Sequence, residues 1–138
     1  AVVQFIKGQW KCGEQENFAD HPLVDFYVMN TGFTWETQDR DKDIAAAKET
    51  WDQAEKFLSD SRYELVVLDE LTYMLTYGYL EKFRVLDAIK NRPSNQHTVV
   101  TGRNASKELI ALADTVSEIN NTKHAFDYGI KVQKGIDY

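Results

Sequence analysis

Residues 63–70 read YELVVLDE, a short apolar run that ends in two acids, Asp69 and Glu70. The run has no alternation of apolar and polar side chains, so it predicts a strand buried on both faces, as in a parallel sheet covered by helices. Acids at the carboxyl end of such a strand point into the crevice where open α/β sheets bind ligands. Carboxylate oxygens there suit Mg²⁺ beside nucleotide phosphates. They are equally typical of a helix cap for the residues from 71 onward, and this stretch alone leaves both interpretations open.

Composition narrows the class of protein. The chain has 138 residues, which suits one domain, and 43% of them are hydrophobic, which is enough for a core. The formal net charge of -6 argues against a nucleic-acid backbone or an anionic membrane as partner. Cys12 is the only cysteine, so a reducing compartment fits and we expect a cytoplasmic protein. No apolar run reaches the roughly 18 residues of a membrane span.

The order of elements predicts the fold class. Apolar runs predict strands at 2–6, 25–29, 63–70, 97–101 and 115–119, and apolar spacing predicts helices at 38–60, 71–77, 80–90 and 106–113. Residues 7–22 and 30–37 are predicted as polar loops. Cap candidates for the longest helix are Thr37, Asp39 and Asp41, and Ser106 is the cap of the last helix. Strands that alternate with helices indicate βαβ units, an α/β fold and a mostly parallel sheet.

Two further sets of residues are candidates for binding. Phe33 and Trp35 lie two apart in a loop, so in an extended segment they point the same way and form a stacking platform for a large flat ligand, unless they fold back on the core. Arg103 follows the strand at 97–101 and faces the same crevice as Asp69, while Lys7 ends the first strand. Each of these two cations either contacts a phosphate or pairs with an acid. The glycine-rich GK[ST] phosphate loop is not found in these residues.

Longer segments are more specific than any single motif. They cover most of the chain in this order: VQFIKGQW, GFTWETQDRD, YELVVLDELTYMLTYGYL, NRPSNQHTVVTGR and ADTVSEINNTKHAFDYGIKVQKGIDY. On these segments the sequence closely resembles the CobA/BtuR-type ATP:corrinoid adenosyltransferases. The resemblance implies a RecA-like P-loop NTPase fold with a mostly parallel central sheet flanked by helices. It also implies transfer of the 5′-deoxyadenosyl group of ATP to cobalt(I) of a corrinoid such as cobalamin, with release of triphosphate.

The resemblance assigns roles to individual residues. The metal acid of the family falls on Glu70, with Asp69 beside it, and the cofactor would be Mg²⁺. The aromatic pair falls on Phe33 and Trp35, which are similar to a wedge that crowds the lower face of the corrin ring and excludes the lower axial ligand. Lys7 and Arg103 are expected near the nucleotide. The family further suggests a homodimer and a flavodoxin-like reductant.

One departure from the family pattern is large. Such enzymes carry a strand, a GNGKGKTT-like phosphate loop and its helix ahead of the VVQFIKG segment, so we expect the 138 residues to be a single adenosyltransferase domain that is incomplete at its amino terminus. Two other functions stay open at this point. One is another P-loop ATPase or phosphotransferase, which the acids alone would permit. The other is a non-catalytic corrinoid- or nucleotide-binding module.

Overall fold

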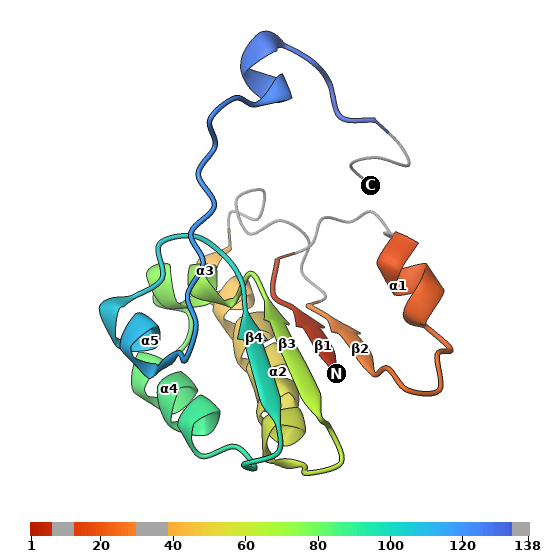
Figure 1. Cartoon of the computed structure of the whole chain (residues 1–138), viewed down its shortest axis with the longest axis vertical. Helices are drawn as coiled ribbons and strands as arrows, with labels where there is room; N and C mark the ends of the chain where they lie inside the picture. The colour runs from red at the N-terminus through yellow and green to blue at the C-terminus, as the bar shows by residue number, and fades with distance from the viewer. Residues whose placement is uncertain (7–12, 30–38, 134–138) are drawn as a thin grey trace.

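The chain folds around a four-stranded parallel sheet, shown in Figure 1. The computed structural model describes residues 1–6, 13–29 and 39–133. The strands are β1 (Val2–Gln4), β2 (Phe26–Val28), β3 (Leu65–Asp69) and β4 (His97–Val100). They lie in the order β2-β1-β3-β4, so β3 is an inner strand. The predicted mostly parallel sheet of an α/β fold is confirmed.

The helices mostly follow the predicted spans. They are α1 (Gly13–Phe18), α2 (Arg40–Ser59), α3 (Leu71–Thr76), α4 (Lys82–Lys90), α5 (Lys107–Leu112) and the 3-10 helix η1 (Ala125–Tyr128). Two predicted caps are confirmed. The Asp39 carboxylate accepts a hydrogen bond from the Lys42 amide at 3.3 Å, and Ser106 Oγ accepts one from the Leu109 amide at 3.3 Å. Among the described residues, no helix is both long and apolar enough to cross a membrane.

Two local predictions are wrong. The first is the polar loop at 7–22, because α1 lies within it. This helix buries none of its residues, so no apolar periodicity marks it, although Glu14 and Glu16 in its first turn favour a helix amino terminus. The second is the strand at 115–119, which forms no ladder. That segment carries β-branched residues, but strand propensity takes effect only where a neighbouring strand offers a partner.

The core lies between the sheet and α2, which runs behind the sheet in Figure 1. Trp51 of α2 is fully buried and its ring stacks on Phe5, just beyond β1, with 6.3 Å between the ring centroids. Val66 and Leu68 of β3 are also fully buried. The apolar spacing of residues 38–60 therefore predicted both the helix and the face that it buries.

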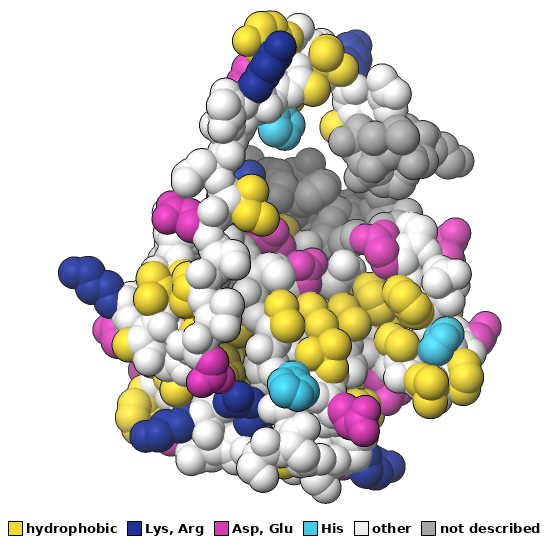
Figure 2. Space-filling view, viewed as in Figure 1, with side chains coloured by type: hydrophobic (Ala, Val, Ile, Leu, Met, Phe, Trp, Pro, Cys, Tyr) yellow, Lys and Arg dark blue, Asp and Glu magenta, His cyan; other side chains and the backbone are white. Residues whose placement is uncertain are grey.

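The opposite face of the sheet is only partly covered. Leu65 and Val99 are 46% and 45% exposed, and Figure 2 shows hydrophobic side chains across this face. Val67, which pairs with Val99, is half-buried. The prediction that the strand at 63–70 is buried on both faces is therefore wrong within the described residues. The helix α2 covers only one face, and side chains on the other face stay partly exposed.

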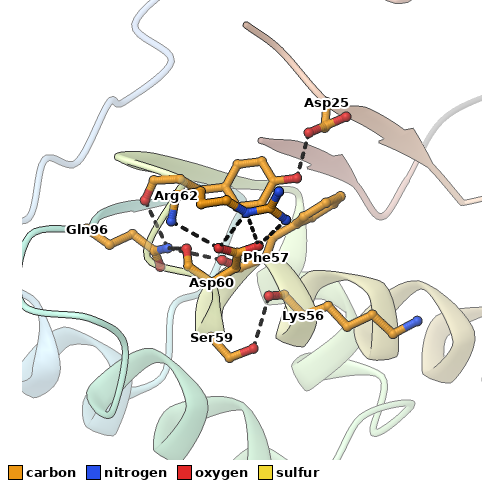
Figure 3. Close-up of polar contacts among 8 residues, drawn as sticks. Asp25, Lys56, Phe57, Ser59, Asp60, Arg62 and Gln96 are labelled. Atoms are coloured by element: carbon orange, nitrogen blue, oxygen red, sulfur yellow. Dashed lines mark hydrogen bonds and ion pairs between the residues drawn. The ribbon is translucent and has the colours of Figure 1, made fainter.

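Gln96 connects the carboxyl end of α2 with the segments that precede β3 and β4, and Figure 3 shows these hydrogen bonds. Its buried Nε2 donates to three backbone carbonyls, at 3.0, 3.2 and 3.1 Å, which belong to Phe57, Asp60 and Tyr63. These carbonyls lie at the end of α2 and on the approach to β3, while Gln96 itself precedes β4. One amide group thus links the end of α2 to the segments that lead into β3 and β4.

Candidate active site

The two acids lie where three parallel strands end together. The sheet register pairs Gln4 of β1 with Asp69 of β3, and Leu68 with Val100 of β4. Thr101 therefore follows β4 beside the end of β3, and its amide donates to the Leu68 carbonyl at 3.1 Å. Because the strands are parallel, their carboxyl ends meet at one edge of the sheet, which is where ligands bind in open α/β folds.

Asp69 is held by hydrogen bonds on both carboxylate oxygens. Thr101 Oγ1 donates to Oδ1 at 2.7 Å, and Gln4 Nε2 donates to Oδ2 at 3.4 Å. The donors come from the strands on either side of β3. A carboxylate fixed from both sides in this way keeps one orientation, because rotation about χ2 would break both bonds.

Glu70 adopts a conformation that is rare for its residue type. Its φ and ψ are 59° and 22°, in the left-handed region, which costs a non-glycine residue about 1–2 kcal/mol. It precedes α3 at the cap position, yet its side chain makes no capping hydrogen bond. The helix-cap interpretation is therefore wrong for this side chain. Strained backbone of this kind occurs at functional sites, where the surrounding structure maintains it.

One carboxylate oxygen of Glu70 has no hydrogen-bond partner among the described residues. This atom, Oε2, is buried. Loss of hydration raises the pKa of Glu70 above its usual value, the neighbouring Asp69 carboxylate raises it further, and Arg103 acts in the opposite direction. A partly dehydrated carboxylate without a donor is a group that a cation would stabilise.

The donor set is compatible with Mg²⁺ that is bound partly by protein and partly by a substrate. Among the residues that the structure describes, no group of three or more His, Cys, Asp or Glu side chains could hold a metal ion. Mg²⁺ is usually bound through one or two carboxylates together with substrate phosphates and water. The buried, unpartnered oxygen of Glu70 beside Asp69 meets that requirement.

The turn after β4 packs tightly against α3. Gly102 has a φ of +137°, and a Cβ at this position would collide with the side chain of Thr72. Thr72 is buried, and its hydroxyl has no partner among the described residues. This contact fixes the start of α3, and so the peptide of Glu70, against the end of β4.

Sequence reasoning missed four residues of this site, which are Gln4, Thr72, Thr101 and Gly102. The sequence does contain a pattern that could have identified two of them. Gln4 is a polar residue inside the apolar run VVQFI, and Thr101 is the last residue of HTVVT, aligned with the strand end at Asp69. Of the predicted residues, the structure brings together Asp69, Glu70 and Arg103. Lys7, Phe33 and Trp35 lie outside the described residues.

Arg40 lies five residues after Trp35 and is held at the first turn of α2. Its Nη2 donates to the Tyr77 carbonyl at 2.9 Å, and its guanidinium lies over the Tyr79 ring at 5.1 Å from the centroid. Both tyrosines belong to the connection between α3 and α4. The segment that carries the aromatic pair therefore joins a helix that is anchored next to the helix beginning after Glu70.

Comparison with known proteins gives consistent matches. A family model described as ATP:corrinoid adenosyltransferase BtuR/CobO/CobP matches residues 1–138. The corrinoid adenosyltransferase of Escherichia coli strain K12 is 51% identical over 137 residues, which is 99% of this chain and 69% of that protein. Corrinoid adenosyltransferase CobA of Salmonella typhimurium strain LT2 is 50% identical, with the same coverage. The corrinoid adenosyltransferase of Pseudomonas aeruginosa strain PAO1 is 53% identical, over 99% of this chain and 68% of that protein.

Proposed function

This chain belongs to the BtuR/CobO/CobP family of ATP:corrinoid adenosyltransferases, and we propose that the ends of β3 and β4 form the magnesium–nucleotide part of its active site. The enzyme transfers the 5′-deoxyadenosyl group of ATP to a corrinoid, a reaction of adenosylcobalamin synthesis. The observation that carries the proposal is the buried, unpartnered Oε2 of Glu70 beside a carboxylate that is already hydrogen-bonded.

The reaction explains why a protein nucleophile is not required. Cobalt(I) of the corrinoid supplies the electron pair and forms a bond to C5′ of the ribose. The C5′–O bond breaks, and triphosphate leaves with its electrons. The work of the protein is to align the two substrates and to stabilise the leaving group, and alignment alone contributes several kcal/mol.

Glu70 is the residue that we expect to bind Mg²⁺ directly. Asp69 lies beside it as the second carboxylate of the pair, and hydrogen bonds to both of its oxygens orient it. Mg²⁺ held there would supply positive charge to stabilise the leaving triphosphate. Arg103 lowers the pKa of Glu70, and this proximity supports the proposal that it contacts the phosphates of the same ligand. We assign Lys7 to the same nucleotide on its position after the first strand.

Phe33 and Trp35 are proposed as the corrinoid wedge. By crowding the lower face of the ring they would exclude the lower axial ligand of cobalt(II). A four-coordinate cobalt lacks that donor, so its accepting orbital falls in energy and reduction to cobalt(I) becomes feasible. Their spacing in sequence and the family to which the chain belongs support this role.

We also infer the larger setting of the site. The parallel order β2-β1-β3-β4, with acids at the end of an inner strand, is compatible with a RecA-like P-loop NTPase fold in a single domain. The family resemblance supports a homodimer and a flavodoxin-like reductant as electron donor.

One assay separates this function from its alternatives. The full-length protein is incubated with MgATP, a corrinoid and a strong reductant, and a light-sensitive cobalt–carbon product is sought. We expect that product together with triphosphate. ATP hydrolysis without it would instead identify a P-loop ATPase, and corrinoid binding without turnover would identify a binding module.

A further inference from the structure

We propose that Thr101 is a positioning residue, whose single hydroxyl sets both the orientation of the Asp69 carboxylate and the backbone conformation of Glu70, the proposed metal ligand. The proposal rests on the adenosyltransferase function for its metal, and on the hydrogen bonds at the end of the sheet for its geometry. It adds to the metal role of Glu70 a residue from another strand end that holds both acids in place.

The hydroxyl of Thr101 acts as donor and acceptor at once. It donates to Asp69 Oδ1 at 2.7 Å and accepts from the Glu70 amide at 3.0 Å. The second bond holds the peptide of a residue whose φ is 59°. A left-handed backbone is unfavourable for glutamate, so it needs such an external partner to persist. The two bonds share one oxygen, so the orientation of Asp69 and the backbone of Glu70 are coupled.

Thr101 can act as a support because it is itself fixed. Its amide continues the β3–β4 ladder by donating to the Leu68 carbonyl at 3.1 Å. The next residue, Gly102, packs on Thr72 in the first turn of α3, which begins directly after Glu70. The residue that carries the hydroxyl is therefore held by contacts to both β3 and α3.

The two acids differ in their hydrogen bonds. Asp69 uses one oxygen for Thr101 and the other for Gln4. Glu70 keeps a buried oxygen with no donor in the described part of the chain. Outer residues that orient a metal ligand typically change metal affinity or activity by about 10- to 100-fold when they are removed. Thr101 is such a residue for Glu70.

The test compares three variants of the full-length protein. Thr101→Val keeps the shape of the side chain and removes the hydroxyl, while Thr101→Ser keeps the hydroxyl. Thr98→Val is the matched control, because Thr98 lies in β4, just before Thr101, and its hydroxyl bonds nothing in the described residues. Two quantities are measured: hydrogen exchange at the Glu70 amide in metal-free protein, and the Mg²⁺ concentration that gives half-maximal adenosylcorrinoid formation from pre-reduced cobalt(I) substrate.

We expect the Glu70 amide to be protected in the unmodified protein and in Thr98→Val, and to exchange faster in Thr101→Val. The Mg²⁺ requirement should rise about 10-fold or more in Thr101→Val and return toward the original value in Thr101→Ser. An unprotected Glu70 amide in the unmodified protein would overturn the proposal, even if Thr101→Val does not fold. An unchanged Mg²⁺ requirement in folded Thr101→Val would also overturn it while leaving the adenosyltransferase function intact. Absence of product from the unmodified protein would overturn that function instead, and the exchange measurement would still decide the role of Thr101.

Discussion

Replacing Glu70 by glutamine should stabilise the ligand-free protein while it impairs the enzyme. Glutamine has the same shape, so the left-handed backbone and its strain are unchanged, and only the charge is removed. A buried polar atom without a partner costs about 1–3 kcal/mol, and more when it is charged; glutamine keeps the unpartnered atom, so only the additional cost of the charge is relieved. Glu70 is only partly buried, so solvent screening reduces that figure. We therefore expect a gain of about 1 kcal/mol, or about 3 °C in Tm for a domain of this size.

The gain should depend on pH in a defined direction. Loss of hydration raises the pKa of Glu70 in the folded state above its usual value of 4.5. Between 4.5 and the raised pKa the folded state binds more protons than the unfolded state, so the stability of the unmodified protein falls as the pH rises through this window. Glu70→Gln removes that titration. Its advantage is therefore absent well below pH 4.5 and complete above the raised pKa.

The measurement is thermal or urea unfolding of both proteins without nucleotide or metal, at several pH values. Glu64→Gln serves as a control, because Glu64 precedes the same strand and is exposed. Its substitution should change stability by less than about 0.5 kcal/mol. If Glu70→Gln is no more stable than the unmodified protein at neutral pH, or if its advantage is equally large in acid, the assignment of an unsatisfied charge to Glu70 is wrong.

Three further substitutions test other parts of the structure. Gln96→Ala removes three hydrogen bonds to backbone carbonyls and should lower the free energy of unfolding by about 2–3 kcal/mol in urea titration; a loss below about 0.5 kcal/mol would contradict its role as a tie. Gly102→Ala should lower the free energy of unfolding by about 3 kcal/mol, through backbone strain and collision with Thr72. Gly78→Ala should lower it by only about 1 kcal/mol, because a Cβ there meets nothing within 4 Å, and equal losses in the two variants would argue against the Gly102–Thr72 contact. Trp35→Ala should abolish product formation when cobalt(II) must be reduced on the enzyme, and spare most of it with pre-reduced cobalt(I); equal loss with both substrates would count against the wedge.

Local signals in the sequence predicted the elements that carry the site. Apolar runs located all four strands, and helical spacing located α2 together with the face that packs on the sheet. The side chains of Asp39 and Ser106 marked helix starts, because capping is a contact within one turn of the chain. These features depend on neighbours in sequence, so a single sequence is sufficient to predict them.

Other features depend on contacts between distant segments. Thr101 contacts Asp69 and Glu70 across more than thirty positions in the sequence. The local sequence HTVVT does not predict that the hydroxyl of its last residue bonds an acid. The left-handed conformation of Glu70 also follows from that contact, since glutamate has no preference for it. The exposed face of β3 was mispredicted because a run of apolar residues shows that a strand can be covered, without showing what covers it.

We propose that the carboxylate of Glu70 serves adenosyl transfer through Mg²⁺. The most direct measurement is a Mg²⁺ titration of cobalt–carbon bond formation from ATP and pre-reduced cobalt(I) corrinoid, with the full-length protein and its Glu70→Gln variant. We predict a light-sensitive product from the unmodified protein, and a requirement for at least about 10-fold more Mg²⁺ in the variant. Superimposable Mg²⁺ curves for the two proteins, or no cobalt–carbon product from the unmodified one, would contradict the account.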